Sequence, residues 1–488
     1  MKKSDIYPNA ENCKVFVINQ PFIKDFCRCQ RWPARTRSRV MRPPDWLSYA
    51  AAVLKKNGYD VNLYDFIANN WDKKKLIALV EEKKPSFVVL DSSTPSIFSD
   101  IECAKICKEH SAARVIMVGT HASALFEETL RLAAGAIDCI AIGEYDYTVE
   151  DIIKNYPVLE MVKGIAYLDN GQVKKTSPRP LIEDLDSLPF PAWEDLDMMK
   201  YFDAGRLYPF MEIIGGRGCP YHCTFCQWPE LMFGHRYRFR SPKNIVDEIE
   251  YDLKLVPKLK YGEFFFEDDT FTVNKERAYE ICEEIARRGL KITWSINARP
   301  DIYDEKLFKV MKKAGCREFL VGFESGSQEI LNNVKKALTV EKSKEFVRIV
   351  KKAGIAIHGC FVFGLPGETK ETAERTMDFA LHLGVDTLQF SGAVPLPGTE
   401  YFAYCKEKGL LKAKSWDDWL DGGEQGAIVD YPGLSINDIS NLVDKGLKKF
   451  YLRPGFIFNF ILKNRNFLDV YRKMRGAFNF CSYLISKK

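Results

Sequence analysis

The chain has 488 residues, of which 46% are hydrophobic, and 71 basic residues against 66 acidic ones leave a formal charge of +5. That length predicts two to four domains, and so modest a charge does not indicate a nucleic-acid partner. No N-terminal signal-like segment or membrane-spanning apolar run is apparent, and the 14 cysteines are scattered along the chain. We therefore expect a cytoplasmic protein with free thiols rather than a disulfide scaffold.

Strands alternate with helical segments in the first third of the chain. Five short apolar runs have the composition of buried strands, and amphipathic segments separate them. This alternation predicts an α/β domain with a doubly wound, Rossmann-like parallel sheet over residues 1–155. The predicted strands are 14–19, 60–65, 86–91, 114–119 and 139–143.

Ligands of such sheets bind beyond the carboxyl ends of the strands. No G-x-G-x-x-G follows any of these strands, which argues against a dinucleotide. The histidine among the loop residues, His121, is either a ligand contact or a structural turn residue. The loop residues that we single out are Ser92, Ser93, Gly119, Thr120, His121, Gly143 and Glu144.

Residues 156–209 have the pattern of a connector, with one further strand predicted at 164–167 and a turn at Asn170–Gly171. Four prolines between 178 and 191 punctuate a largely extended segment, as is typical of linkers.

A buried strand near residue 211 then leads into a loop with Cys219, Cys223 and Cys226 in C-x₃-C-x₂-C spacing. Zinc sites normally take four ligands from two separated pairs, and no second pair follows at a suitable distance. Three cysteines on one short loop instead indicate a [4Fe–4S] cluster with one iron left open for a small molecule. The alternative is three buried structural thiols.

The alternation of strands and helices continues six times over residues 210–400. It predicts a partial (β/α)₆ TIM-type barrel, whose active site gathers at the carboxyl-end loops. Those loops carry polar or glycine-rich residues, although Glu267 or Glu324 can equally be solvated or paired with Arg299. The segments are Glu267–Thr270, Asn297–Arg299, Gly322–Gly326, Gly364–Thr369 and Pro395–Thr399.

The cysteine loop, with Phe225 directly before its last cysteine, closely resembles the cluster loop of the radical S-adenosylmethionine (SAM) superfamily. The resemblance implies that Cys219, Cys223 and Cys226 bind a [4Fe–4S] cluster that cleaves SAM to a 5′-deoxyadenosyl radical. It also implies SAM contacts from acidic residues after the second barrel strand, a Glu-Ser pair after the fourth and a glycine-rich segment near the fifth. Mapped onto this chain, the SAM contacts are Phe225, Glu267, Asp268, Asp269, Glu324, Ser325, Gly364 and Gly367.

The N-terminal loops resemble the cobalamin (vitamin B12)-binding domain that precedes the barrel in one large radical SAM class. Thr120 departs from the Gly-Gly-x-His pattern of that class. The Asp-x-His-x-x-Gly motif is absent, so the resemblance implies cobalamin with its base displaced and no histidine below the cobalt. The implied contacts are the seven loop residues from Ser92 to Glu144 given above. The alternative is a domain that keeps the fold without cobalamin.

Residues 401–488 are predicted to form a helical region rich in aromatic residues. From Gly446 onward there are ten basic residues and one acidic residue, Asp469. A basic aromatic helix can make peripheral contact with an anionic membrane surface. It can also cap the barrel with its basic side in water, and we favour the cap.

The segment after Cys226 resembles the branch that contains the anaerobic magnesium-protoporphyrin IX monomethyl ester cyclases and the hopanoid cyclitol-forming enzymes. This resemblance implies ring formation or rearrangement at an unactivated C–H position of a lipid-linked polyol or related small molecule, with flavodoxin or ferredoxin as electron donor. Two alternatives stay open, namely a cobalamin-dependent radical SAM methyltransferase and a non-enzymatic cluster or cobalamin sensor. Arg236, Arg238 and Arg240 in this segment either bind substrate or pair with acidic residues.

Overall fold

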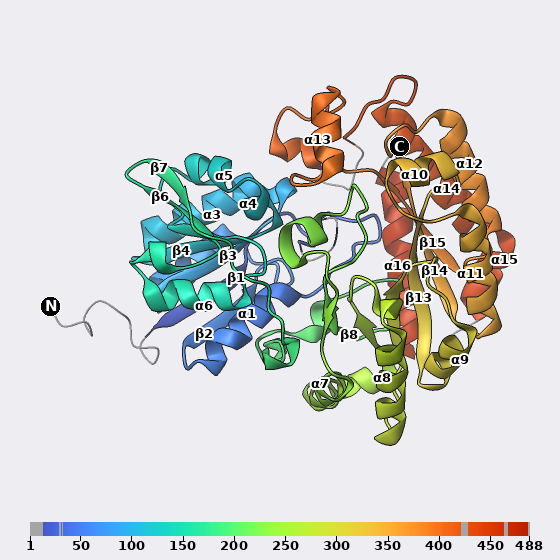
Figure 1. Cartoon of the computed structure of the whole chain (residues 1–488), viewed down its shortest axis with the longest axis horizontal. Helices are drawn as coiled ribbons and strands as arrows, with labels where there is room; N and C mark the ends of the chain where they lie inside the picture. Colours follow the sequence, from blue (N-terminus) through green and yellow to red (C-terminus); the bar gives the residue numbers. More distant parts are fainter. Residues whose placement is uncertain (1–12, 29–30, 32, 421–427, 463–466, 487–488) are drawn as a thin grey trace.

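The computed structural model describes residues 13–28, 31, 33–420, 428–462 and 467–486. Figure 1 shows two α/β lobes, the N-terminal one in blue to teal and the second in green to red. Each lobe is built on one parallel sheet, so the fold class predicted from the sequence is confirmed.

The N-terminal sheet has the strand order β2-β1-β3-β4-β5-β6-β7, and its first five strands in that order are parallel. Helices α1 and α6 pack on one face, and α2, α3 and α5 pack on the other. Both faces are therefore buried, as expected of a doubly wound sheet. The strands are β1 Lys14–Asn19, β2 Asp60–Asp65, β3 Phe87–Ser92, β4 Arg114–Gly119 and β5 Cys139–Ala141, and the helices are α1 Asp45–Lys56, α2 Lys73–Lys83, α3 Ile97–His110, α4 Thr120–Ala124, α5 Phe126–Ala133 and α6 Asp146–Asn155.

Two details of this lobe differ from the sequence prediction. Strands β6 (Ile165–Asp169) and β7 (Gln172–Lys175) form a hairpin that joins the sheet antiparallel, so the sheet extends past residue 155 into the predicted connector. Asn170 and Gly171 both have positive φ, which is why the Asn-Gly pair can make the hairpin turn. The predicted loop at 120–124 folds as the short helix α4.

The second sheet has the order β15-β14-β13-β12-β11-β8, and all its neighbouring pairs are parallel. The two edge strands, β8 and β15, do not pair with each other, so the six-unit barrel is open, as predicted. Its strands are β8 Phe210–Ile213, β11 Glu263–Phe266, β12 Trp294–Ala298, β13 Cys316–Glu324, β14 Ala356–Phe363 and β15 Thr387–Gly392, with helices α7 Pro242–Leu255, α8 Lys275–Arg287, α9 Glu305–Lys313, α10 Gln328–Asn333, α11 Val340–Lys352 and α12 Lys370–His382.

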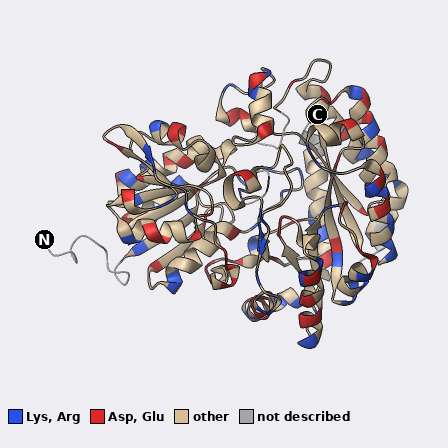
Figure 2. Ribbon diagram, viewed as in Figure 1, with Lys and Arg blue, Asp and Glu red and all other residues tan. Residues whose placement is uncertain are grey.

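Side-chain caps define where most barrel helices begin. Ser241, Asn274, Asp304, Thr339 and Thr369 each accept a hydrogen bond from a backbone N–H of the first helical turn. Such caps satisfy N–H groups that have no partner within the helix. Figure 2 shows charged residues concentrated on the outer helices, whereas the strands are largely uncharged.

The C-terminal helices cover the open side of the barrel. Helix α14 (Ile436–Tyr451) packs against β15 and α12, and a Cβ at Gly446 would lie 2.7 Å from the Phe390 ring, so glycine permits this close approach. Helices α13 (Glu400–Glu407), α15 (Pro454–Leu462) and α16 (Phe467–Ser486) complete the predicted helical region. None of the helices described in the structure is long and apolar enough to cross a bilayer.

Buried arginines join the two lobes. Arg217 donates to Glu144 at 2.8 Å and to both carboxylate oxygens of Asp146 at 2.7 and 3.0 Å, and Arg238 also donates to Glu144 at 2.9 Å. All four side chains are almost completely buried. Arg236 and Arg240 pair with Glu183 and Glu248, so all three arginines of this segment pair with acidic residues.

Removing one side of this buried network should be costly because the remaining charges stay buried without a partner. We expect Arg217→Ala to lower the free energy of unfolding by about 3–5 kcal/mol. The matched control is Arg236→Ala, whose ion pair with Glu183 is about two-thirds exposed and should contribute less than about 1 kcal/mol. Urea unfolding midpoints measure both, and equal midpoints for the two variants would contradict the assignment.

Candidate functional site

The cysteine loop is held at its base by a short antiparallel ribbon. Strand β9 (Gly216–Arg217) pairs with β10 (Arg238–Phe239), so the chain between them leaves the barrel edge and returns to it. Gly218 has φ +89°, and a Cβ there would lie 2.3 Å from the Arg236 carbonyl oxygen. Only glycine fits this closure of the loop.

The three loop cysteines border one cavity. Burial raises the pKa of Cys219 to about 11 and that of Cys226 to about 12, so both are neutral thiols until a metal displaces their protons. Three thiols on one short loop suit separate irons of a [4Fe–4S] cluster.

Arg299 reaches the same loop from the end of β12. Its guanidinium lies 3.7 Å from the Cys223 sulfur and 3.5 Å from the centre of the Tyr221 ring. The chain therefore supplies a positive charge next to the expected cluster.

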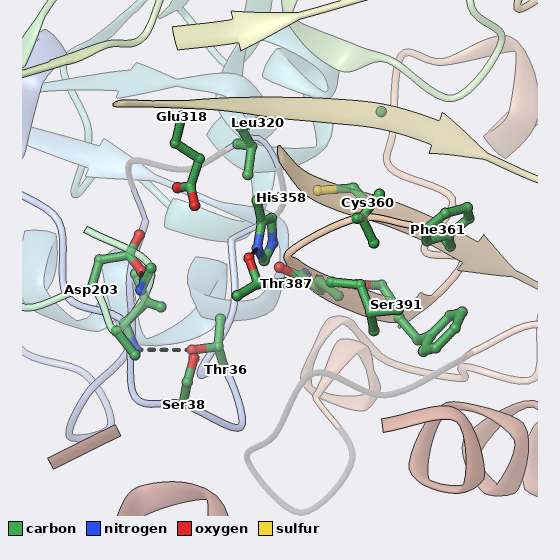
Figure 3. Close-up of a pocket in the computed structure, with 18 of the residues that line it drawn as sticks. Thr36, Ser38, Asp203, Glu318, Leu320, His358, Cys360, Phe361, Thr387 and Ser391 are labelled. Carbon is green, nitrogen blue, oxygen red and sulfur yellow. Dashed lines mark hydrogen bonds between the residues drawn. The ribbon is translucent and has the colours of Figure 1, made fainter. Parts of the chain in front are cut away.

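The cavity has a volume of about 1330 Å³. Pockets for one drug-sized ligand usually measure about 300–1,000 Å³, so this cavity has room for SAM and a second molecule together. It extends from the cysteine loop along the inner face of β13, β14 and β15 to helices α14–α16 (Figure 3).

Polar groups line the cavity toward the amino ends of the strands. His358 lies with Nδ1 2.8 Å from Thr387 Oγ1, and both face the cavity near Glu318. Burial lowers the pKa of His358 to about 4, so the imidazole is neutral at physiological pH. Arg206 and Arg317 share Glu318 as a partner, which leaves this end of the cavity polar but nearly balanced in charge.

Aromatic side chains of the C-terminal helices and the sheet also line the cavity, so its lining is partly apolar and partly polar. They are Phe361, Phe390, Tyr451, Phe456, Phe460 and Phe480.

Two of the three acidic residues predicted after β11 border the cavity. Glu267 pairs with Arg42 at 3.1 Å, and Asp269 pairs with Arg31 at 2.6 Å. Asp269 also accepts a hydrogen bond from the backbone N–H of Gly218, directly before the first cluster cysteine. Contact of these two carboxylates with the SAM amine stays a prediction.

Asp268, between them, points elsewhere. It accepts hydrogen bonds from Gly215 N–H and Tyr237 O–H at 2.7 Å each and pairs with Arg277 at 3.2 Å. It does not line the cavity, so its observed contacts support the base of the cysteine loop.

Of the remaining predicted SAM residues, some line the cavity and others do not. Phe225 and Glu324 line the cavity, and Glu324 pairs with Lys336 at 2.7 Å. Ser325 is buried against Thr376 at 2.9 Å, and Gly364 and Gly367 both have positive φ in a turn away from the cavity lining. For all eight of the predicted residues, contact with SAM stays a prediction.

The carboxyl edge of the N-terminal sheet brings several predicted cobalamin residues together. Ser92 accepts from the N–H of Ala122, Ser93 bonds Ser96, and His121 lies 3.1 Å from Thr94 Oγ1. Nε2 of His121 is buried without a hydrogen-bond partner, which leaves a polar atom for a ligand at this edge. Burial lowers the pKa of His121 to about 3, so the ring is neutral there.

Backbone geometry explains two of the loop glycines. Gly119 has φ +99°, and a Cβ there would lie 2.3 Å from an Asp91 carboxylate oxygen. Gly143 has φ +78° and lies against the Leu231 carbonyl oxygen of the π-helix Pro229–Phe233. Thr120 begins α4, while Glu144 is engaged by Arg217 and Arg238 at the lobe interface. None of the seven residues lines the cavity that the loop cysteines border, and their contact with cobalamin stays a prediction.

Sequence reasoning missed the residues that reach the site from far along the chain. Arg31 and Arg42 precede the barrel by more than 160 residues, yet they pair with its acidic residues. Lys336, His358 and Cys360 also line the cavity. The sequence patterns around them do not indicate that their side chains face a cavity. Arg28, Arg35, Arg37 and Arg39 belong to the same irregular basic stretch, which was the one available hint to Arg31 and Arg42.

A three-cysteine loop at the carboxyl edge of an open parallel barrel, facing a Rossmann-like sheet, defines a radical enzyme with a cobalamin-type domain. The comparisons agree: residues 213–380 match the Radical SAM superfamily and residues 38–153 match the B12 binding domain. The chain is 32% identical over 440 residues to an uncharacterized methyltransferase of Pyrococcus horikoshii, covering 89% of this chain and 93% of that protein. The chain therefore belongs to the B12-binding radical SAM family. Its cofactors are a [4Fe–4S] cluster, SAM and cobalamin, and it is an enzyme rather than a sensor.

Other relatives show the range of the family. The anaerobic magnesium-protoporphyrin IX monomethyl ester cyclase of Cereibacter sphaeroides is 34% identical over 431 residues, covering 85% of this chain and 68% of that protein. The solved structure of TsrM, a radical SAM methyltransferase from Kitasatospora setae, matches 97% of this chain and 99% of its own with a TM-score of 0.71 at 17% identity. The cobalamin-dependent enzyme OxsB matches 97% of this chain and 72% of its own, also with a TM-score of 0.71 at 17% identity. The two structures establish the shared fold.

Glu368, in the glycine-rich turn after β14, makes the folding stability depend on pH. Burial raises its pKa to about 8, although it accepts hydrogen bonds from the N–H groups of Gly364 and Leu365. The folded state therefore keeps this proton from about pH 4.5, the ordinary value, up to about pH 8. Since the folded state binds the extra proton, this contribution to stability falls as pH rises through that window.

Glu368→Gln cannot ionise at this position. We therefore expect its melting temperature to fall less than that of the wild type as the pH rises from about 5 to about 8. The control is Glu345→Gln, a surface carboxylate paired with Arg348, whose curve should run parallel to the wild type. Thermal unfolding at a series of pH values measures this, and parallel curves for Glu368→Gln and the wild type would refute it.

Proposed function

We propose that this enzyme is a cobalamin-dependent radical SAM methyltransferase that methylates an unactivated carbon of an amphipathic substrate. The observation that carries the proposal is the cavity of about 1330 Å³, which the cluster cysteines line together with polar and aromatic side chains. The similarity to a methyltransferase over most of both chains supports methyl transfer as the reaction.

The cofactors supply the hard chemistry of such an enzyme: the cluster with SAM provides a hydrogen-abstracting radical, and cobalamin provides a transferable methyl group. The protein chain itself binds and orients SAM and the substrate. Glu267 and Asp269 offer carboxylates toward the SAM amine, and neutral His358 with Thr387 offers hydrogen bonds to a polar substrate group. Helices α14–α16 cover the cavity and exclude water from the reacting atoms.

The substrate class follows from the polar and the apolar side chains of the cavity lining. Hydroxyl, amide or imidazole partners at one end suit a polar group of low net charge, since the arginines there are already paired with acidic residues. The aromatic side chains of the lining suit an apolar ring system or chain. A lipid-linked or similarly amphipathic molecule satisfies both, and a low-potential flavodoxin or ferredoxin would deliver the electron to the cluster.

Ring formation is the second candidate, because the chain also resembles a cyclase at 34% identity. The two reactions leave different products of SAM. Methyl transfer consumes one SAM as methyl donor and gives S-adenosylhomocysteine, whereas both reactions give 5′-deoxyadenosine from the radical step.

We expect anaerobically reconstituted protein, reduced with dithionite, to form 5′-deoxyadenosine from SAM, and to form S-adenosylhomocysteine only when cobalamin is supplied. The triple variant Cys219→Ala, Cys223→Ala, Cys226→Ala should form no 5′-deoxyadenosine, because it lacks every predicted cluster ligand. Cys107→Ala, which removes a buried thiol of the other lobe, is the control and should behave as the wild type. Mass spectrometry measures both products.

Deoxyadenosine without S-adenosylhomocysteine in the presence of cobalamin would favour ring formation over methyl transfer. No SAM cleavage by protein with a full complement of cluster iron would contradict both candidates.

We also propose that the C-terminal helices contact an anionic membrane surface, from which an amphipathic substrate can enter. Ile457, Phe458, Met474 and Phe478 expose 42–71% of their surface on α15 and α16. The segment from Gly446 onward is strongly basic by sequence, although four of its ten basic residues lie outside the described residues. Exposed apolar side chains beside basic ones are typical of helices that lie on anionic bilayers.

We expect the protein to sediment with vesicles rich in phosphatidylglycerol and not with pure phosphatidylcholine vesicles. The double variant Phe458→Ser, Phe478→Ser should lose most of this binding, because it removes apolar surface that would enter the interface. Leu132→Ser, an exposed apolar position on the N-terminal lobe, is the control. Equal sedimentation of all three proteins with the acidic vesicles would count against the proposal.

A further inference from the structure

Three side chains converge on the outer side of the cysteine loop, away from the cavity. The ligand atoms of His222, Glu230 and His235 all lie within 4.8 Å of one another. None of the three lines the cavity that the cluster cysteines share. We propose that this trio is a second metal site that binds one divalent transition-metal ion, with zinc as its preferred occupant.

The hydrogen bonds of His235 prepare it as a metal ligand. Its Nδ1 lies 3.2 Å from the Cys219 carbonyl oxygen and 3.1 Å from that of Tyr221. Because carbonyl oxygens only accept hydrogen bonds, Nδ1 carries the proton and a neutral ring leaves Nε2 with a free lone pair. Metal-binding histidines typically have this arrangement, in which the second ring nitrogen donates to a backbone carbonyl.

That lone pair faces a carboxylate. Nε2 of His235 lies 2.9 Å from Glu230 Oε1, so two acceptors meet unless a proton or a cation sits between them. Two ligand bonds of about 2.1 Å at a tetrahedral angle separate their ligand atoms by about 3.4 Å. An ion therefore fits between Nε2 and Oε1 after a movement of about half an ångström, which exposed side chains can make.

His222 is the third ligand of the proposed site. Its ring stacks on that of His235 with centroids 3.9 Å apart and an interplanar angle of 24°, so this exposed side chain must rotate to point its lone pair at the ion. Two imidazoles and one carboxylate suit zinc better than magnesium or calcium, which prefer oxygen ligands. His222 and Glu230 are exposed, so water can take the fourth position of a tetrahedral site.

The position of the trio indicates what the ion would do. His222 lies between the first two cluster cysteines, and Glu230 belongs to the π-helix whose Leu231 carbonyl lies against Gly143 of the N-terminal lobe. An ion held by both would fasten the cluster loop to the segment that contacts the cobalamin-type domain. The site is therefore structural, and it is independent of which reaction the enzyme performs.

The test uses the complete enzyme with its cluster in place, so that the three cysteines are occupied. After a chelating resin has removed loosely bound metal, zinc is titrated anaerobically and bound zinc is counted by mass spectrometry after gel filtration. We expect about one zinc ion per chain for the wild type. Zinc binding should be at least tenfold weaker for His222→Ala, for His235→Ala and for Glu230→Gln. Glu230 lies four residues beyond the last cluster cysteine.

Two further readouts separate ligation from folding. His110→Ala, which removes a remote surface histidine paired with Glu81, should bind zinc as the wild type does. Zinc should raise the melting temperature of the wild type but not of Glu230→Gln, since a ligand stabilises only a protein that binds it. X-ray absorption at the zinc edge should show nitrogen and oxygen ligands only.

No bound zinc in the wild type would overturn the proposal. Wild-type affinity in all three variants, or sulfur among the zinc ligands, would do so as well. If His222→Ala or His235→Ala also loses cluster iron, its zinc binding is not counted. The zinc affinity of Glu230→Gln then decides the test.

Discussion

The meeting of the two lobes depends on buried arginines at the base of the cysteine loop. Arg217 and Arg238 stand on the two strands of the β9–β10 ribbon and share Glu144 of the N-terminal lobe, while Arg217 also binds Asp146. A buried charge without a partner costs several kcal/mol, so this set of contacts strongly disfavours other orientations of the lobes. The result is that the carboxyl edge of one parallel sheet faces that of the other.

That orientation brings several distant segments of the chain to the cavity beside the cysteine loop. The cysteine loop closes one end, the C-terminal helices close the open side of the barrel, and Arg31 and Arg42 come from the N-terminal segment to pair with Asp269 and Glu267. The acidic residues that we propose as SAM ligands are thus already paired with arginines. Each carboxylate therefore has a partner within the cavity, and neither is buried there as an unpaired charge.

Sequence alone predicted the parts of the site that are local. The cysteine spacing, the loop glycines and the strand-helix alternation each depend on residues close together in the chain, and both sheets formed as expected. The contacts between distant segments could not be predicted, because nothing near Arg42 signals Glu267, 225 residues away. Nor could sequence separate Asp268 from Asp269, since only the fold decides which of two adjacent carboxylates faces the cavity. On β14, His358 and Cys360 alternate with buried apolar residues. The sequence of this strand is therefore typical of an ordinary half-buried strand and does not indicate a cavity wall.

The most direct measurement is anomalous X-ray scattering at the iron and cobalt edges from one crystal of the anaerobically prepared enzyme with both cofactors. The account predicts iron at Cys219, Cys223 and Cys226, and cobalt at the edge formed by Ser92, Gly119 and His121. Iron held elsewhere, or cobalt absent from that edge in protein that retains cobalamin, would contradict it.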